Sequence, residues 1–299
     1  PLYNASLNSR NQSSDLVLSN YFIAEYMPLE TLKIRAKLGL THSNTDSEVF
    51  YSPSDTRYDE LDATLKGDFN SSNTKRTKLD ASLTGIYAEV IGDNRFTFAV
   101  DAKISETRSL AQSYAATGFP EGDYTYPSFS NGYPNGGTPG YNESVSRSAS
   151  FLGTLNYAYD NRYLITATYR RDGSSKFAKK NRYGHFPSVS LGWNIAEEHF
   201  MKNISWIDQL KLRGGYGVLG NQEIDNYMYT STITSNINYP DGNGGLYQGA
   251  FPKKFANPDI KWEETTMTNI GVDVLLFKNR LSFNGDWYYK KTKDILLTV

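Results

Sequence analysis

Residues 32–40, LKIRAKLGL, alternate between an apolar side chain and a charged or small one at every position. A period of two is that of a β-strand with one apolar face and one polar face. The same alternation returns in residues 96–104 and 281–289, whereas the period of an amphipathic helix is nearly absent. The sequence therefore predicts an all-β fold built from two-faced strands.

Ten strands in five hairpins account for the alternating segments. Three of the predicted turns contain an Asn-Arg pair, and asparagine tolerates the positive φ that a tight hairpin turn requires. The connection 196–209 is longer, and its AEEHFMKN stretch is typical of a short helix. The predicted hairpins are 17–27 with 31–42, 77–91 with 95–106, 149–159 with 163–171, 187–195 with 210–218, and 266–277 with 281–291.

Long segments rich in Gly, Pro, Ser, Asn and Tyr connect these hairpins, at 43–76, 107–147, 172–186 and 219–265. Tight and long connections therefore alternate along the chain. An antiparallel transmembrane β-barrel has this arrangement, because its inner turns are short and its outer loops are long. Predicted strands such as 77–91 are also long enough to cross a bilayer at a tilt.

The composition narrows the function classes. Lys and Arg number 31 and Asp and Glu number 32, so the net charge of −1 gives no sign of a nucleic-acid-binding surface. The lack of cysteine excludes disulfides and thiolate metal sites, and the 3 histidines show no ligand spacing. No segment approaches the roughly 20 apolar residues of a membrane helix. Residues 1–12 have neither the basic nor the apolar region of a signal peptide.

Short motifs that suggest enzymes or cofactors lack their structural context. Residues 215–220 (GYGVLG) match a nucleotide-binding pattern, but no apolar helix follows them. Residues 241–245 (DGNGG) lack the later ligands of a calcium loop. Residues 172–175 (DGSS) have no base nearby, and adjacent carboxylates such as Glu263 and Glu264 face opposite sides of a strand. We therefore expect no enzyme activity, no catalytic residue, no metal site and no cofactor.

The polar faces of the strands are expected to line the lumen of the barrel, where they would face water, a solute or a plug. A solvated face without selectivity is the alternative for each of these side chains. The residues predicted to face the lumen are Lys33, Arg35, Lys37, Arg170, Lys211, Arg213 and Asp286.

The outer loops carry most of the candidate recognition chemistry. Exposed aromatic rings can stack on sugars or become buried against a protein partner. We expect a protein lid to contact them, with direct contact to a solute as the alternative. The candidate residues are Tyr124, Tyr126, Phe129, Tyr133, Tyr239, Tyr247 and Phe251.

A series of longer motifs in the second half of the chain resembles the late barrel region of the SusC/RagA family of TonB-linked outer-membrane proteins. Several motifs in the same order are much more specific than any one of them. They are RRDGSSKF (170–177), NRYGHFPSVSLGWNI (181–195), EEHFM (197–201), LKLRGGYGVLGNQ (210–222), NPDIKWEETTMTNIGVDV (257–274) and DWYYKKTKDIL (286–296).

The resemblance implies a 22-stranded barrel in the outer membrane of a Gram-negative bacterium, with a plug inside it. It also implies nutrient import, in which a SusD-like surface lipoprotein captures an oligosaccharide or peptide and a TonB complex opens the plug. We expect residues 1–299 to be one partial barrel without a plug domain. The region that contacts TonB would then lie in an N-terminal part outside this chain.

Two other classes of protein share the alternation of polar and apolar residues. A passive outer-membrane porin or adhesion barrel has the same strands but no energised partner. A soluble β-sandwich binding module would instead bury its apolar faces and expose charged ones such as Lys33, Arg35 and Lys37.

Overall fold

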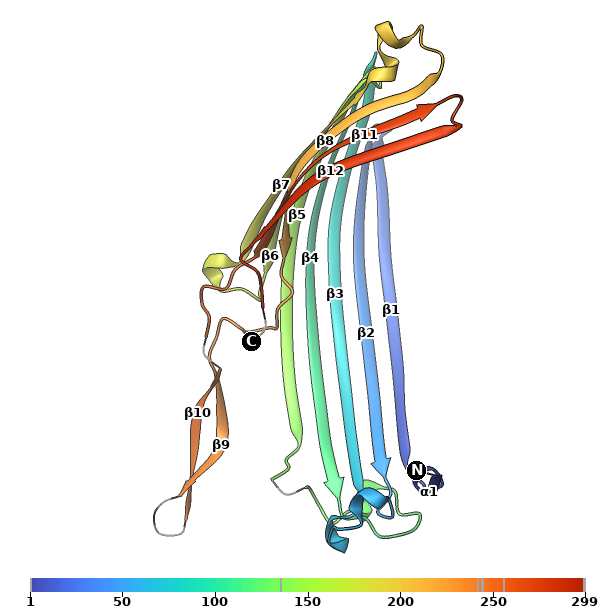
Figure 1. The fold of residues 1–299 in the computed structure, drawn as a ribbon. Helices are drawn as coiled ribbons and strands as arrows, with labels where there is room; N and C mark the ends of the chain where they lie inside the picture. The colour runs from blue at the N-terminus through green and yellow to red at the C-terminus, as the bar shows by residue number, and fades with distance from the viewer. Residues whose placement is uncertain (1, 135, 241, 243–244, 255, 298–299) are drawn as a thin grey trace. The chain divides into compact units, whose positions relative to one another are not determined.

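The computed structural model describes residues 2–134, 136–240, 242, 245–254 and 256–297. Ten of the strands in this part of the chain form one antiparallel sheet in the order β1-β2-β3-β4-β5-β6-β7-β8-β11-β12 (Figure 1). The strands are β1 (Arg10–Leu29), β2 (Leu32–Tyr51), β3 (Asp68–Ile91), β4 (Asn94–Thr117), β5 (Gly140–Tyr159), β6 (Tyr163–Ser174), β7 (Tyr183–Asn194), β8 (Ile207–Asn221), β9 (Thr232–Pro240), β10 (Leu246–Lys254), β11 (Glu263–Leu276) and β12 (Leu281–Lys293).

Helical structure is confined to short segments. None of those in the described residues has the length and apolar character that a membrane-crossing helix needs. They are α1 (Leu2–Ala5) and the 3-10 turns η1 (Thr56–Tyr58), η2 (Ala63–Leu65), η3 (Pro127–Phe129), η4 (Lys179–Asn181), η5 (Ile195–Glu197) and η6 (His199–Met201).

The all-β prediction and the ten strands of the main sheet are confirmed. The structure adds a separate two-stranded sheet, β9 with β10, within the segment predicted to be one long loop. The AEEHFMKN stretch forms two 3-10 turns, η5 and η6, rather than one short helix. The calcium-like stretch 241–245 lies largely outside the described residues.

The positive φ expected for the asparagine of three tight turns is confirmed in two of them. Asn161 and Asn279 have φ values of 52° and 63°, which places both in the left-handed region. In the third turn Gly92 takes this conformation instead, with φ at 58°. Asn94 belongs to β4, where its side-chain amide donates to the carbonyl oxygen of Ile91 at 3.2 Å. Glycine takes the left-handed position more readily than asparagine, because it has no Cβ.

On one face of the sheet, a row of side chains that crosses six neighbouring strands is almost wholly apolar. Leu191 is 56% exposed and Trp287 is 58% exposed, so the structure leaves these large side chains uncovered. Exposure of a continuous apolar row is the opposite of what a soluble β-sandwich requires, and it is what a lipid-facing barrel surface requires. The row runs, partner to partner across β5, β6, β7, β8, β11 and β12, through Tyr157, Ile165, Leu191, Gly214, Ile270 and Trp287.

The neighbouring row, one residue along each strand, has polar or small side chains. Because successive residues point to opposite faces, these belong to the other side of the sheet. The register thus separates an apolar face from a polar one over six strands. This row consists of Asn156, Thr166, Ser190, Gly215, Asn269 and Tyr288.

Two compact units divide the described chain, and the first contains Pro1–Phe22, Gly39–Leu79 and Glu106–Val145. It holds the two longest loops between β2 and β5, and a small aromatic core. Phe50 and Phe69 are fully buried in this core, with Phe119 and Ala116 beside them.

The second unit contains Ile23–Leu38, Asp80–Ser105 and Ser146–Val299. Its buried core consists of Phe177, Phe186 and Trp262. The side chains packed around this core are Val218, Ile224, Ile260 and Leu296.

Strand length differs along the sheet. The strands β3 and β4 have 24 residues each, about twice the roughly 9–11 that cross a bilayer. Their halves next to the tight turn alternate with apolar residues, as in FTFAVDAKI (96–104), whereas the loop-side halves are polar, as in DFNSSNTKRTK (68–78). The apolar halves have the length and pattern to lie in lipid, and the polar halves suit an aqueous environment.

Candidate functional site

Two loops of the first unit, residues 52–67 and 118–134, are joined by backbone hydrogen bonds; we call them the paired loops. The amide of Phe119 donates to the carbonyl oxygen of Lys66 at 2.8 Å, and the amide of Gly118 donates to that of Gly67 at 3.3 Å. Phe119 packs edge-on against Phe50 with ring centroids 5.2 Å apart. An aromatic core therefore anchors the point where the two loops meet.

Gly118 sits where no other residue fits without displacement. Its φ is 77°, and a Cβ added there would overlap the carbonyl oxygen of Thr64 and the side chain of Asn131. The amide of Asn131 donates to the carbonyl oxygen of Thr117 at 2.9 Å, and its side chain donates to that of Thr64 at 3.3 Å. Glycine thus allows the close approach that fixes one loop to the other.

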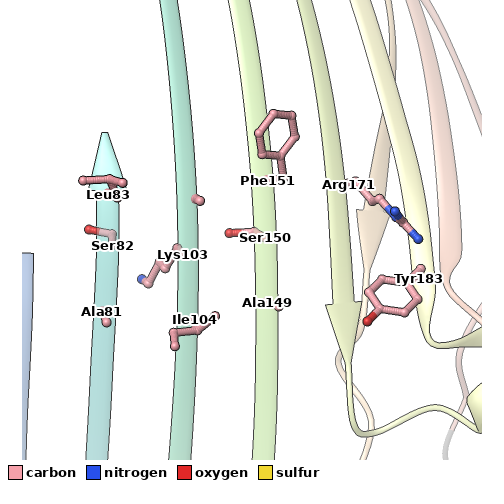
Figure 2. A pocket seen from close by; sticks show the side chains of 11 residues that line it. Ala81, Ser82, Leu83, Lys103, Ile104, Ala149, Ser150, Phe151, Arg171 and Tyr183 are labelled. Carbon is pink, nitrogen blue, oxygen red and sulfur yellow. The ribbon is translucent and has the colours of Figure 1, made fainter. Parts of the chain in front are cut away.

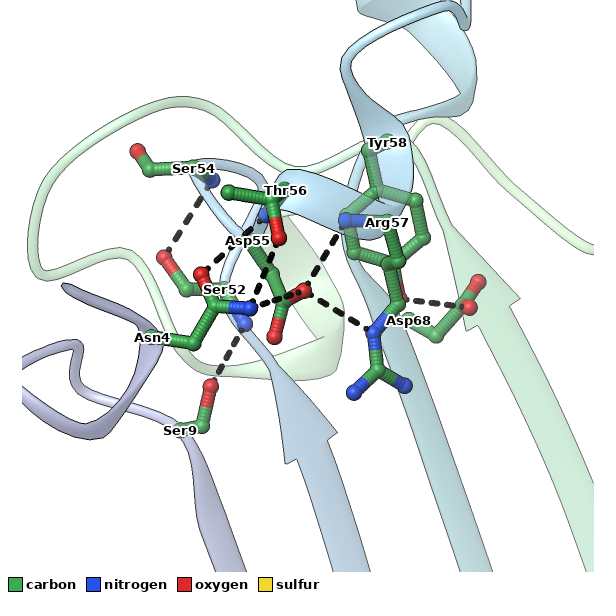
Figure 3. Close-up of polar contacts among 9 residues, drawn as sticks. All are labelled: Asn4, Ser9, Ser52, Ser54, Asp55, Thr56, Arg57, Tyr58 and Asp68. Carbon is green, nitrogen blue, oxygen red and sulfur yellow. Dashed lines mark hydrogen bonds and ion pairs between the residues drawn. The ribbon is translucent and has the colours of Figure 1, made fainter. Parts of the chain in front are cut away.

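A network around Asp55 organises the first of the paired loops (Figure 3). The Asp55 carboxylate accepts from the amide of Arg57 at 3.0 Å and from the side chain of Asn4 at 3.1 Å. It also forms an ion pair with the guanidinium of Arg57 at 3.1 Å. That guanidinium lies 3.7 Å from the centre of the Tyr51 ring, in a cation–π arrangement. The buried Tyr58 hydroxyl donates to Asp68 at 2.7 Å.

The hydrogen bond from the Arg57 amide and the charge of its guanidinium lower the pKa of the Asp55 carboxyl in the folded protein. A lowered folded pKa stabilises the fold at every pH above the unfolded value of about 3.9, and this stabilisation disappears as the pH falls through the folded value. Burial, together with the hydrogen bond to Asp68, raises the pKa of the Tyr58 hydroxyl, which therefore stays neutral at physiological pH.

We expect Asp55→Ala to loosen segment 52–67 at neutral pH and to have little effect once the pH has fallen below the lowered pKa of the Asp55 carboxyl, where the wild-type group is protonated. Loss of a helix-capping carboxylate costs about 1 kcal/mol, which corresponds to roughly a fivefold faster local opening. Hydrogen–deuterium exchange of residues 52–67 measures this at each pH. Asp59→Ala removes an exposed carboxylate from the same loop and should change little. Equal effects of Asp55→Ala at pH 7 and at a pH below the lowered pKa of the Asp55 carboxyl would contradict the role of the charge.

A cavity of about 510 Å³ lies between the paired loops. Phe119 and Phe129 give it apolar walls, and Lys66 and Glu121 add one charge of each sign. Such a lining suits a ligand with both apolar and polar groups. The sequence predicted Phe129 as a site residue but missed Lys66 and Glu121, because only the folded loops bring them together.

Of the predicted aromatic residues of this loop, Phe129 lines the cavity and the others lie elsewhere on the loop. Tyr124 contacts Phe129 edge-on, with ring centroids 5.1 Å apart. Tyr126 and Tyr133 are exposed on the same loop. Their exposure leaves them available to a lid or a solute.

The remaining predicted aromatic residues lie on the β9–β10 hairpin. Tyr239 and Tyr247 are direct partners across the two strands, and Phe251 lies opposite Thr234. All three rings are exposed. The hairpin therefore gathers two tyrosines that the sequence placed only in one long loop.

The residues predicted to line the lumen carry paired charges. Glu25 of β1 bridges Lys33 at 2.9 Å and Arg35 at 2.5 Å, while Lys37 lies further along β2. Arg170 pairs with Asp172 at 2.7 Å on β6.

Arg213 joins three strands of the sheet. Its guanidinium pairs with Asp273 of β11 at 3.1 Å and with Asp286 of β12 at 2.8 Å. Between them lies Gly271, where an added Cβ would come within 2.7 Å of the Arg213 guanidinium carbon. Glycine therefore lets the side chain pass over β11. Lys211 is the strand partner of Asp273 and adds a further positive charge to this face.

Among the described residues, no group of three or more histidine and carboxylate side chains is placed to hold a metal ion. The polar face and the loops instead present single charges, ion pairs and exposed aromatic rings.

Comparison with known proteins gives relatives of one kind. Residues 3–299 match the family described as "TonB dependent receptor-like, beta-barrel". A TonB-dependent receptor of Formosa agariphila is 31% identical over 308 residues, which cover 100% of this chain and 30% of that protein. TonB-dependent receptor SusC of Bacteroides thetaiotaomicron is 44% identical over 154 residues, or 50% of this chain and 15% of that protein.

The structure of the RagAB peptide transporter is similar to 97% of this chain, with a TM-score of 0.85 and 25% identity, and the match covers 31% of that chain. The present chain thus spans about a third or less of the length of these relatives. The family consists of transporters and receptors and not of enzymes. The strand order, the exposed apolar row and these matches together show that the chain belongs to the TonB-dependent receptor β-barrel family, found in the outer membrane of Gram-negative bacteria.

Proposed function

We propose that this chain is the plug-free barrel portion of an outer-membrane importer that takes up an oligosaccharide or a peptide. The observation that carries the proposal is the mostly apolar row across six strands, in which Ile165, Leu191, Ile270 and Trp287 are exposed, backed by a polar row on the other face. Such a sheet separates lipid from an aqueous lumen. The import step itself would involve binding and movement, with no covalent chemistry in this chain.

The partners follow from the relatives. A SusD-like surface lipoprotein would cover the outer loops, and a TonB complex would act through a region of the longer protein. The similarity to the RagAB peptide transporter supports a peptide solute, and the similarity to SusC supports the same class of importer. The exposed aromatics of the paired loops and of the β9–β10 hairpin are the proposed contacts for the lid or the solute. The paired charges of the polar face would line the path of the solute.

Uptake by cells that express the full-length protein tests this function. Fluorescein-labelled oligopeptides from a tryptic digest and fluorescein-labelled oligosaccharides from a dextran hydrolysate serve as probes. We expect one of the two to accumulate in cells with active TonB and not in cells without it. Equal accumulation in both strains would show a passive barrel. Accumulation of neither probe, with the folded protein present at the surface, would contradict import of these two solute classes.

The triple variant Tyr124→Ala, Tyr126→Ala and Phe129→Ala tests the paired loops in the same assay. Aromatic residues are enriched among the minority of interface side chains whose truncation costs about 2 kcal/mol or more, and one such residue among the three would lower uptake or lid affinity by roughly tenfold or more. Phe200→Ala removes an equally exposed aromatic ring from the tight-turn side and should leave both unchanged. Wild-type lid affinity and wild-type uptake in the triple variant would remove the paired loops from the proposed site.

A further inference from the structure

A second cavity, of about 550 Å³, lies on the second unit where β3 to β7 run side by side (Figure 2). Its walls include Leu83, Ile104 and Phe151, one from each of β3, β4 and β5. Arg171 and Tyr183, from β6 and β7, also line it. The side chains of Leu83, Ile104 and Phe151 are exposed, so the cavity is an open groove and not part of the core.

The groove belongs to the apolar face of the sheet. Phe151 is the strand partner of Arg171, and Arg171 is the partner of His185. Arg171 lies six positions beyond Ile165 on β6, and an even spacing puts both side chains on one face. Ile165 belongs to the exposed apolar row described above. Arg171 is therefore a cation on the lipid side of the strand.

The shape of the groove suits a hydrocarbon chain. Ala81, Ala102 and Ala149 contribute to its lining beside the larger side chains, so small residues lie next to protruding ones on each of three strands. A strip of small residues flanked by larger apolar ones leaves space for an extended acyl chain. Each buried methylene group of such a chain adds to the binding free energy.

The position of Arg171 along the strand corresponds to the lipid headgroups. Tyr163 marks the tight-turn end of β6, and Arg171 lies eight positions further along. At a rise of about 3.3 Å per residue this is about 26 Å of strand, or about 20 Å of depth at the usual tilt. The apolar band of such barrels is about 25 Å tall. Arg171 thus lies near the far boundary of the apolar band, on the side of the long loops.

An aromatic ring holds the side chain of Arg171 in place. Its guanidinium carbon lies 4.5 Å from the centre of the Tyr183 ring. The Tyr183 ring itself lies against Gly173, where an added Cβ would come within 2.6 Å of it. In the part of the chain that the structure describes, no carboxylate pairs with Arg171, whereas its neighbour Arg170 on the opposite face pairs with Asp172 at 2.7 Å.

Polar groups lie beside this cation. The Tyr169 hydroxyl and the Nδ1 atom of His185 are 2.6 Å apart, and His185 is the strand partner of Arg171. A guanidinium at headgroup depth that has no carboxylate partner among the described residues suits a phosphate, because arginine binds phosphate oxygens in a two-pronged manner.

We propose that this groove binds a phosphorylated glycolipid of the outer leaflet, with the phosphate on Arg171 and one acyl chain along Leu83, Ile104 and Phe151. The glycolipid is the occupant because the cation lies on the long-loop side, which faces the cell exterior in such barrels. The lipid would fix the depth of β5 to β7 in the bilayer without contacting the import path.

Native mass spectrometry of the full-length protein in detergent tests the proposal. The probes are bisphosphorylated lipid A, its dephosphorylated form, phosphatidylglycerol and inorganic phosphate. We expect wild-type protein to retain lipid A in preference to the other three. Arg171→Gln should reduce this retention by about tenfold, a typical effect of losing a hydrogen bond to a charged group. Arg171→Lys should keep part of it.

The matched control is Arg170→Gln, which removes the same charge from the opposite face of the same strand and should leave lipid A retention unchanged. A heat-dependent gel shift verifies that each variant is folded. Equal retention by wild type and Arg171→Gln would overturn the proposal. Equal binding of dephosphorylated lipid A would show that the phosphate makes no contact. Preference for phosphatidylglycerol would overturn the assignment to a glycolipid. Binding of inorganic phosphate alone would overturn the assignment to a lipid.

Discussion

Replacing Trp262 by alanine should lower the free energy of unfolding by about 3–5 kcal/mol, the usual range for a large aromatic side chain in a packed core. Trp262 is 5% exposed and lies against Phe177 and Phe186, with ring centroids 5.1 Å and 5.4 Å away. Its indole N–H donates to the carbonyl oxygen of Arg182 at 3.2 Å. The substitution removes the ring that links the β6–β7 connection to the start of β11. It also removes one of two donors to the Arg182 carbonyl oxygen, which still accepts from the amide of Ser174 at 3.0 Å.

Urea unfolding of the full-length protein in detergent, followed by intrinsic fluorescence, measures this loss. Trp206→Ala is the matched control, because Trp206 is 50% exposed and stacks on Phe277 at a tight turn. We expect a markedly smaller loss there. Trp262→Phe should recover part of the stability, since it fills most of the space but cannot donate. If both alanine variants lost the same free energy of unfolding, the ring of Trp262 would contribute no more to stability than an exposed one, which would contradict the prediction.

An arginine introduced at Val189 should lower stability by about 2–4 kcal/mol, as measured for arginine at the midplane of other outer-membrane barrels. Val189 belongs to the exposed apolar face and is the strand partner of Ala167 on one side and Tyr216 on the other. Ala167 lies four positions from Tyr163, about 13 Å along the strand, which is near the middle of the apolar band. A charge there has no water within reach.

Ser190→Arg provides the matched comparison, since the same side chain is added one residue away on the polar face. We expect it to change stability by less than about 1 kcal/mol, because the polar face is hydrated. The fraction that keeps its heat-dependent gel shift after reconstitution, and the urea midpoint, report the difference. A soluble sandwich predicts the reverse order, so Ser190→Arg proving more damaging than Val189→Arg would refute the membrane orientation.

The sequence predicted the strands well where one of their faces meets lipid, and poorly where both faces are polar. Alternation in stretches such as 96–104 located every strand of the main sheet, because lipid on one side and water on the other impose a period of two. The loop-side half of β3, DFNSSNTKRTK (68–78), has polar residues on both faces, so its sequence resembles that of a loop. Strand pairing alone extends β3 through it. For the same reason the β9–β10 hairpin, in a stretch rich in Gly and Asn, was predicted to be loop.

The candidate site was less predictable than the fold. Charge type and alternation assigned Arg213 and Asp286 to polar faces, but their contact depends on the register of three strands and on Gly271 between them. Likewise, the motifs around Phe177, Phe186 and Trp262 supported the family resemblance, yet nothing in their spacing showed that the three rings pack together. Such contacts join residues far apart in sequence, which local patterns do not encode.

The pairing of Asn221 with Glu263 has a consequence for how proteins of this kind diversify. These two residues are direct partners in the main sheet. The chain therefore leaves the sheet after Asn221 and returns to it at Glu263, an adjacent position, and the stretch 222–262 with the β9–β10 hairpin lies between them. The entropy of closing such an excursion grows only slowly with length, by about 0.6 kcal/mol per doubling. Recombination could therefore exchange this stretch for one of another length without shifting the barrel register, provided that Ile224, Ile260 and Trp262 are kept. Strands and core would remain while the surface presented to the medium changed.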